Sequence, residues 1–234
     1  MTYPSVTIAM LIYRSQQWLS FALGGLAWAR NRTPYRVMVV GNDAEPRVMA
    51  TGRVDIDHRN ADPTEHYLSR VYRAWNAAVA AAETDWVVMI NSDMYVSDYW
   101  LDALVHEKIW KPKSLPCSLL VESGRIPSAM PEYVRNLGTT IDWFDREAWR
   151  RHAGSLRLRG DGKREPGRLF MPVLVDRQEF ADIGGYPSGN VLTPNGCVVS
   201  GDRILFDKYA AAGYEWVTCL DSVVYHVQEG EMRG

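Results

Sequence analysis

The sequence of 234 residues has few cysteines, no long apolar run and almost no net charge. Its three cysteines, Cys117, Cys197 and Cys219, are odd in number and widely spaced, which argues against a disulfide framework or a zinc-binding motif. No apolar run approaches the ~20 residues that span a bilayer, and the first residues lack the basic stretch of a signal peptide. The formal net charge of -2 provides no general attraction to nucleic acids or anionic membranes. We therefore expect a cytoplasmic protein without a transmembrane segment, with peripheral contact to a membrane left open.

Short apolar segments alternate with segments whose apolar residues recur at helical spacing. Strands are predicted at residues 6–12, 35–40, 53–57, 86–90, 115–121, 169–175, 216–220 and 223–227. Helices are predicted to begin at polar residues that can cap a first turn, namely Ser15, Asp62 (followed by Pro63 at the first helical position), Asp98, Asp176 and Ser200. A further helix is expected over 139–152 with Gly154 as its stop. The Gly-, Arg- and Lys-rich stretch 155–168 is expected to be a loop.

This alternation predicts an α/β fold with a Rossmann-like, mixed and mostly parallel central sheet flanked by helices. The sequence contains no internal repeat and no linker rich in proline or serine. Its length and its 47% content of hydrophobic residues suit one large core. We therefore expect a single domain over residues 1–234.

The segment 86–93 carries the clearest sign of a site. Its first five residues are apolar without interruption, and Asn91, Ser92 and Asp93 follow directly. A continuous apolar run predicts a strand that is buried on both faces. Ligands of open α/β sheets bind beyond the carboxyl ends of the strands, where an aspartate can hold a divalent cation. The same three residues also suit an ordinary turn, so this segment alone leaves both interpretations open.

Other polar residues stand at similar positions. Asn42 and Asp43 follow the second predicted strand, and a parallel sheet would bring them to the same edge as Asp93. Asp202 lies in the first turn of a predicted helix, where a carboxylate can serve as a general base or simply stabilise the helix dipole. His226 ends the last predicted strand, and a lone histidine there is more often structural than a metal ligand.

Taken in order, these segments resemble the family-2-like inverting glycosyltransferases of the GT-A fold. The motifs that carry the resemblance are the apolar opening at 6–13, Val-Met-Val-Val-Gly-Asn-Asp at 37–43, Arg70, Asn-Ala-Ala-Val at 76–79, Asp-Trp and the strand to Asn-Ser-Asp at 85–93, Asp-Ile-Gly-Gly-Tyr-Pro at 182–187, Gly-Asp-Arg at 201–203, and His226. The resemblance covers most of the chain and is weakest from about 112 to 168. It implies an enzyme that uses a nucleotide-diphosphate sugar, with a UDP-sugar favoured.

The resemblance also implies roles for individual residues. Those implied to bind the nucleotide sugar are Tyr13, Asn42, Asp43, Arg70, Asn91, Ser92 and Asp93. Asn-Ser-Asp occupies the place of the D-x-D motif, so an amide replaces the first carboxylate and can still hydrogen-bond to the ribose. Asp93 matches the metal-binding aspartate, and His226 matches the histidine that completes the metal site. The implied cofactor is Mn²⁺ or Mg²⁺, and a carboxylate with an imidazole suits Mn²⁺ better.

Asp202 matches the catalytic base of the family, which usually has Glu-Asp where this chain has Gly201-Asp202. The implied reaction is one in-line displacement at the anomeric carbon with inversion, in which Asp202 takes the proton of the acceptor hydroxyl. The resemblance assigns nucleotide-sugar binding to residues 1–110 and acceptor binding with the catalytic base to residues 111–234.

Two alternatives were weighed against this function. A sugar nucleotidyltransferase would carry a glycine-rich loop after its first strand, and residues 13–17 contain no glycine. A non-catalytic nucleotide-sugar or glycan binding module of the same fold remains the alternative, supported by the departures at Asn91 and Gly201.

The acceptor is left open by the sequence. Between residues 146 and 168 basic residues outnumber acidic ones, which suits an anionic hydroxyl-bearing acceptor such as a phosphorylated glycan, a lipid-linked acceptor or a nucleic acid. The same segment could hold the donor diphosphate when the loop closes, or could be a solvated loop.

Overall fold

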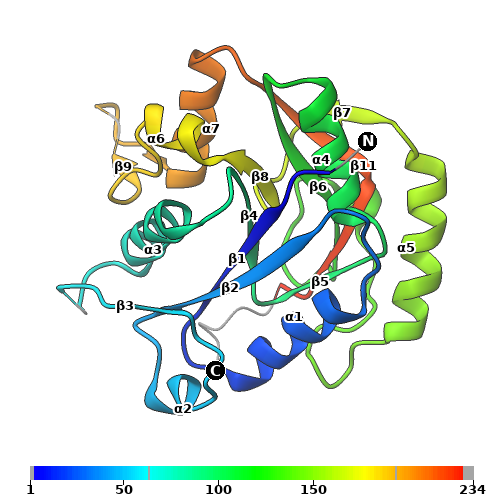
Figure 1. Cartoon of the computed structure of the whole chain (residues 1–234), viewed down its shortest axis with the longest axis horizontal. Coiled ribbons are helices and arrows are strands. Elements are labelled where there is room, and N and C mark those ends of the chain that lie inside the picture. Colours follow the sequence, from blue (N-terminus) through cyan, green and yellow to red (C-terminus); the bar gives the residue numbers. More distant parts are fainter. Residues whose placement is uncertain (1–2, 63, 193, 229–234) are drawn as a thin grey trace.

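The computed structural model describes residues 3–62, 64–192 and 194–228 of the chain. The strands of its main sheet are β1 (Val6–Ile12), β2 (Tyr35–Asn42), β3 (Ile56–His58), β4 (Trp86–Asn91), β5 (Met94–Val96), β6 (Ser114–Glu122), β7 (Arg164–Pro166), β8 (Val173–Asp176) and β11 (Glu215–His226). Neighbouring strands follow the order β3-β2-β1-β4-β8-β6-β11-β5, and β7 pairs with β11 (Figure 1).

Most strands of this sheet point the same way. β1 is parallel to β2 and β4, β2 is parallel to β3, and β6 is parallel to β11. β8 runs antiparallel between β4 and β6, while β5 and β7 run antiparallel to β11. The mixed, mostly parallel sheet expected from the alternating pattern is therefore confirmed. Every residue of β6 is buried, as are the four central residues of β4, which agrees with strands covered on both faces.

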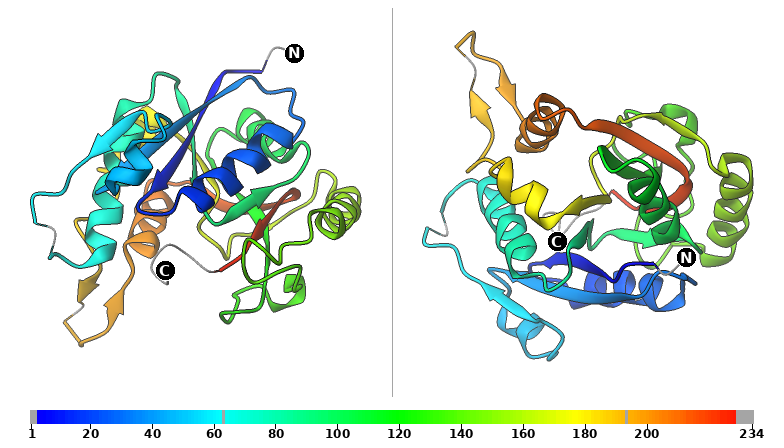
Figure 2. Two further views of the ribbon diagram at one scale, coloured as in Figure 1. Left: turned by 90° about the horizontal axis from the view of Figure 1, so that it is seen from below. Right: turned by 45° about the horizontal axis from the view of Figure 1, so that its top comes forward.

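Helices flank the sheet. They are α1 (Gln16–Trp28), α2 (Pro46–Met49), α3 (Tyr67–Ala81), α4 (Trp100–Trp110), α5 (Arg146–Gly160), α6 (Arg177–Asp182) and α7 (Gly201–Ala211), with a 3₁₀ turn at Pro131–Tyr133. α3 packs on β1 and β2, α4 packs on β6 and β11, and α5 packs on β11. α3 and α5 consequently lie at opposite sides of the molecule in every view (Figure 2).

Three of the predicted helix caps are confirmed, and two are wrong. The side chains of Ser15, Asp176 and Ser200 accept hydrogen bonds from the first turns of α1, α6 and α7. Asp62 instead accepts from Thr64, and α3 begins later, capped by His66. Pro63 lies outside the described residues. Asp98 binds Arg30 and does not cap α4, which begins after Tyr99; the Asn31 side chain instead accepts from the Leu101 N–H in its first turn.

The basic segment is mainly helical, which corrects the predicted loop at 155–168. Asp145 caps α5, and Trp149, Ala153 and Leu156 bury one face of it. This apolar stripe carries the helix through Gly154 as far as Gly160, which lies so close to Leu220 that a Cβ atom there would stand 2.4 Å from the Leu220 carbonyl oxygen. The predicted helix at 139–152 therefore starts and ends several residues too early.

Strand ends also differ from the predictions. The strands expected at 216–220 and 223–227 form one strand, β11, with a register shift between Cys219 and Val223. β3 starts later than predicted because the Asp55 side chain accepts from the Val39 backbone N–H. β8 starts after Pro172, which has no N–H to donate to a neighbouring strand.

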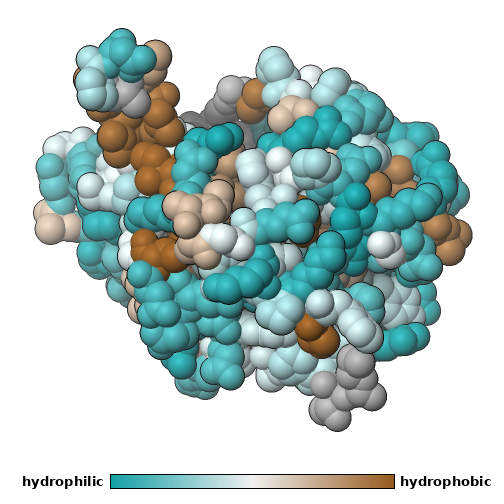
Figure 3. All heavy atoms as spheres, turned by 90° about the horizontal axis from the view of Figure 1, so that it is seen from above, coloured by the Kyte–Doolittle hydropathy of each residue, from teal (hydrophilic) through white to brown (hydrophobic). Residues whose placement is uncertain are grey.

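A small hairpin, not predicted from the sequence, projects from the body of the molecule. Its strands are β9 (Val191–Leu192) and β10 (Val198–Val199). Val191, Leu192 and Val198 are exposed and form the apolar projection in Figure 3. No helix among the described residues is long and apolar enough to cross a membrane.

Candidate active site

The carboxyl ends of β1, β2 and β4 meet at one edge of the sheet. These strands are parallel and in register, with Ile12 opposite Gly41 and Leu11 opposite Asn91. Asn42, the last residue of β2, and Tyr13, which follows β1, therefore lie at that edge. The carbonyl of Tyr13 accepts a hydrogen bond of 3.0 Å from the Glu45 N–H, which holds the chain after β1 against the chain after β2.

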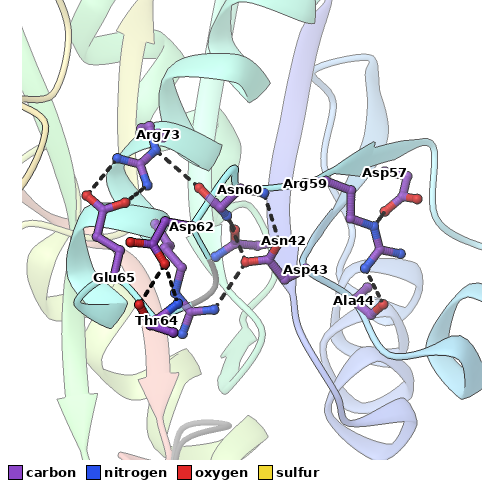
Figure 4. Close-up of polar contacts among 11 residues, drawn as sticks. Asn42, Asp43, Ala44, Asp57, Arg59, Asn60, Asp62, Thr64, Glu65 and Arg73 are labelled. Carbon is purple, nitrogen blue, oxygen red and sulfur yellow. Dashed lines mark hydrogen bonds and ion pairs between the residues drawn. The ribbon is translucent and has the colours of Figure 1, made fainter.

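Asp43 is the centre of a polar cluster at this edge (Figure 4). One carboxylate oxygen accepts from the Asn60 backbone N–H at 2.9 Å, and the other accepts from the Asn60 amide at 2.8 Å and from Arg70 Nη1 at 3.1 Å. The Asn60 amide also donates to Asn42 at 3.0 Å. The structure thus brings Asn42, Asp43 and Arg70 together, although these residues come from β2 and α3.

Burial and hydrogen bonding act in opposite directions on Asp43. Burial raises its pKa, but the donors of Asn60 and Arg70 outweigh burial and hold the pKa below its ordinary value. Asp43 is therefore a fixed anion at neutral pH. Arg70 Nε is buried and has no hydrogen-bond partner among the described residues. Because an unpaired buried donor is costly, this atom is suited to a ligand oxygen at the same edge.

Asp93 and His226 form a second cluster. The Asp93 carbonyl accepts from the Val227 N–H at 3.1 Å, which places the chain after β4 beside the end of β11. Asp93 Oδ2 lies 3.2 Å from His226 Nε2. On the other side of the ring, His226 Nδ1 lies 3.0 Å from Glu122 Oε1, and Glu122 faces His226 in the register of β6 and β11. The two residues implied to hold a metal are therefore adjacent.

The field at this cluster is strongly negative. Burial lowers the pKa of His226, but Asp93 and Glu122 outweigh burial and raise it to about 10. Glu122 is itself a buried anion, because hydrogen bonds from His226 and Gln228 more than offset the effect of burial and lower its pKa. Two carboxylates around one imidazole attract a proton, and the same field favours a divalent cation.

Asp93 and His226 supply only some of the ligands that a divalent cation needs. Glu122 occupies Nδ1 of His226 and leaves Nε2 facing the Asp93 carboxylate, and a carboxylate on the far nitrogen is the usual support of a histidine ligand. In the part of the chain that the structure describes, no group of three or more His, Cys, Asp or Glu residues could hold a metal ion. Asp93 and His226 therefore suit a cation whose remaining ligands come from phosphate and water.

Asp202 lies in a pocket of tyrosines at the start of α7. Its two carboxylate oxygens accept from the hydroxyl groups of Tyr72 at 3.2 Å and Tyr186 at 3.3 Å. The two rings are stacked, with centroids 5.0 Å apart and planes 7° apart. Burial raises the pKa of Asp202, and the two phenol donors offset part of that rise. Tyr72 lies on α3 two residues beyond Arg70, so α3 links this pocket to the Asp43 cluster.

The tyrosine pocket accounts for the glycine before Asp202. A Cβ atom on Gly201 would stand 2.2 Å from the Tyr72 ring, and the Gly201 N–H donates to the Tyr72 hydroxyl at 3.1 Å. An acidic side chain at position 201 has no room, because the ring of Tyr72 occupies its place.

Gly201→Ala should therefore lower the free energy of unfolding by about 1–3 kcal/mol, the usual cost of overpacking a rigid site. Denaturant unfolding measures this change. Gly154→Ala in α5 is the matched control: its Cβ would meet nothing within 4 Å, so we expect an effect between zero and a stabilisation of ~1 kcal/mol. A Gly201→Ala protein as stable as the Gly154→Ala protein would contradict the close packing on Tyr72.

The arrangement of the strands and helices is similar to that of a solved structure. A crystal structure of GalNAc-T7 with UDP, GalNAc and Mn²⁺ superposes with a TM-score of 0.63 at 10% sequence identity, and the match covers 96% of this chain and 44% of that one. The fold is GT-A-like. At this identity the likeness concerns the fold alone, and this chain spans less than half of the GalNAc-T7 chain. No protein-family model and no curated protein matches the sequence.

Four residues of the GT-A-like domain belong to these clusters and were missed from the sequence. Asn60 and Glu122 bind Asp43 and His226, while Tyr72 and Tyr186 bind Asp202. Glu122 is the last residue of an apolar strand, and Asp93 lies two residues beyond another. A carboxylate in that position could have indicated a site residue from the sequence. Tyr72 has the helical spacing of a core residue, and nothing in the sequence distinguishes its hydroxyl from others.

Proposed function

We propose that this protein is a metal-dependent inverting glycosyltransferase that transfers a sugar from a nucleotide-diphosphate sugar, in the first place a UDP-sugar, to an acceptor hydroxyl. The observation that carries the proposal is the contact of 3.2 Å between Asp93 Oδ2 and His226 Nε2 beyond the end of β4, in a GT-A-like fold. The proposal treats the chain as one domain, with the donor held mainly by residues 1–110. Membership of family 2 is part of the proposal.

In this mechanism the donor binds along the carboxyl ends of β1, β2 and β4. Asp43 and Arg70 hold the nucleoside, and the unpaired Nε of Arg70 supplies a donor for it. Tyr13, Asn42, Asn91 and Ser92 complete the proposed nucleotide-sugar site. Asp93 and His226 would hold Mn²⁺ or Mg²⁺, which supplies positive charge to the departing diphosphate.

Asp202 is the proposed base. As the acceptor oxygen forms its bond to the anomeric carbon, its proton passes to the Asp202 carboxylate, and the bond between that carbon and the diphosphate oxygen breaks. Because attack and departure lie on opposite sides of the carbon, the configuration inverts. Each oxygen of Asp202 accepts one phenol hydrogen bond and keeps a second lone pair, which can accept the hydrogen bond of the acceptor hydroxyl.

A panel of UDP- and GDP-sugars with Mn²⁺ tests this function, with nucleotide release as the readout. We expect release with at least one UDP-sugar and its loss on chelation of the metal. Binding of a donor without any turnover across a broad acceptor panel would instead favour a non-catalytic nucleotide-sugar binding module. The observation favouring that second function is that both Asp202 oxygens already accept hydrogen bonds from tyrosine hydroxyls.

Asn91→Asp restores the missing carboxylate of the motif and should keep the protein active. We expect Mn²⁺ affinity to be equal or up to ~10-fold higher, because a carboxylate within ~4 Å of a divalent cation contributes on the order of 1–2 kcal/mol even in water-like surroundings. Titration of Mn²⁺ in the presence of UDP measures the affinity. A complete loss of UDP binding would mean that the Asn91 amide has a role other than the neutral hydrogen bonding proposed for it.

The structure changes the proposed part played by the basic segment. Residues 146–160 form α5, and residues 164–166 form β7, which pairs with β11, so most of this segment is held in regular structure. Closure of residues 155–168 as a loop over the donor diphosphate is therefore no longer proposed. The acceptor of the reaction is proposed only as a hydroxyl-bearing molecule.

A further inference from the structure

A cavity of about 490 Å³ opens between the end of α1, the connection from β5 to α4, and α5. Its lining includes Trp28, Arg30, Ser97, Asp98, Arg150 and Arg157. None of the residues proposed for the donor, the metal or the base lines it. α3, which carries Arg70, lies at the other side of the molecule from α5 (Figures 1 and 2).

Positive charge exceeds negative charge in this cavity. Arg30 pairs with Asp98 at 2.7 Å, and Arg150 pairs with Glu147 at 3.4 Å. Arg151 and Arg157 also line the cavity, and neither forms an ion pair within the described ranges. Two guanidinium groups are thus left without a carboxylate, and they face the same space.

Aromatic rings hold these arginines in place. The guanidinium of Arg157 lies 5.0 Å from the centre of the Tyr99 ring, and those of Arg30 and Arg32 each lie 5.9 Å from it. Arg150 lies 4.4 Å from the centre of the Trp28 ring. A stacked guanidinium keeps its N–H groups free at its edge, which is the geometry that binds phosphate in two parallel hydrogen bonds.

Tyr99 itself adopts an unusual conformation. Its φ of 62° is left-handed, which is uncommon for a bulky residue, and it places the ring among the arginines just before the first turn of α4. Strain of this kind is typical of functional sites.

The buried hydroxyl of Ser97 is a second observation, independent of the arginines, that indicates a ligand in the cavity. Its side chain is buried and its hydroxyl has no hydrogen-bond partner in the described structure, although it lines the cavity. The backbone N–H of Ser97 donates to Val223, which fixes the residue in place. A buried hydroxyl without a partner is costly, and an anionic oxygen in the cavity would satisfy it.

We propose that this cavity binds a small phosphate-bearing molecule at a site separate from the nucleotide donor. Arg157 and Arg151 provide the charge, and Ser97 donates its hydroxyl to a phosphate oxygen. Trp28 flanks the remainder of the ligand, and Tyr99 contacts Arg157. The proposal does not depend on the proposed transferase activity.

Calorimetric titration with inorganic phosphate and with a hexose 6-phosphate, at constant ionic strength, tests the site. The wild-type protein should bind at least one of them, Arg157→Gln should weaken binding at least ~10-fold, and Ser97→Ala should weaken it several-fold. Preference for the hexose phosphate identifies an organic ligand, and equal affinity identifies phosphate itself. Arg159→Gln is the control, because Arg159 lies on α5 but does not line this cavity.

UDP binding should be unchanged in all three variants, which separates this site from the donor site. Unfolding curves should be unchanged in the two arginine variants and unchanged or shifted to higher stability in Ser97→Ala, which removes the unpaired buried hydroxyl. The proposal is overturned if the wild-type protein binds neither probe, or if Arg159→Gln weakens binding as much as Arg157→Gln does. Binding of a short DNA duplex or heparin without binding of either small probe would also overturn it and would identify a surface for an anionic polymer.

Discussion

Replacing Asp202 with asparagine should reduce sugar transfer by about 10²–10⁴-fold, the usual contribution of a general base, while UDP-sugar binding stays within about twofold. Asparagine keeps the shape of the side chain; its oxygen can accept from one tyrosine hydroxyl, and its amide N–H can donate to the other. It cannot take the proton of the acceptor hydroxyl. Initial rates and donor titrations separate the two effects.

Asp207→Asn provides a matched control for this experiment. Asp207 lies on the same helix, α7, and pairs with Arg203 at the surface, so we expect a normal rate. Equal rates for the Asp202→Asn and wild-type proteins would exclude Asp202 as the base.

The pH dependence offers a second readout of Asp202. Burial raises its pKa above the ordinary value for aspartate, and the base acts only when ionised, so the rate should fall as the pH drops through this raised pKa. Tyr72→Phe removes a donor that lowers the pKa of Asp202. The acid limb of the rate profile should therefore move to higher pH in Tyr72→Phe, and an unchanged limb would contradict the hydrogen bond as a control on the base.

Replacing Asp93 with alanine should weaken Mn²⁺-dependent UDP binding by at least ~100-fold, because loss of a partner that only supports a metal ligand already costs 10–100-fold. Asp93 is buried beside His226 and is one of two side-chain ligands proposed for the cation. Titrations of UDP with Mn²⁺ and with a chelator measure the effect.

In the chelator the Asp93→Ala and wild-type proteins should bind UDP equally weakly, since the lost interaction passes through the cation. Asp57→Ala is the control, because Asp57 is a carboxylate of the same sheet that pairs with Arg59 near the surface. Thermal unfolding must accompany these titrations, since removal of Asp93 leaves the His226 imidazole with one carboxylate partner fewer. Unchanged Mn²⁺-dependent binding in a folded Asp93→Ala protein would contradict the proposed metal site.

Local signals predicted much of the fold. The apolar runs located β1, β4 and β6, and the hydroxyl groups of Ser15 and Ser200 marked the starts of α1 and α7. The predicted cap at Asp98 was wrong because a distant partner had taken the side chain that the local pattern needed. Asp98 binds Arg30, so it does not cap α4.

The candidate site could be predicted in part. Asp93 and His226 were linked through the family resemblance, and the structure places them in contact. Glu122 carried a signal at the end of its strand, but its partner His226 lies 104 positions away; Tyr72 carried none, and its partner Asp202 lies 130 positions away. The glycine at position 201 looked like a lost acid, and only the Tyr72 ring explains it.

A crystal structure of the protein with UDP and Mn²⁺ tests the central claim most directly, because it needs no knowledge of the acceptor or the sugar. We predict metal density bonded to Asp93 Oδ2 and His226 Nε2, with the UDP diphosphate completing the coordination and the uridine beside Asp43 and Arg70. Metal and diphosphate bound away from Asp93, or UDP bound away from the ends of β1, β2 and β4, would contradict the account.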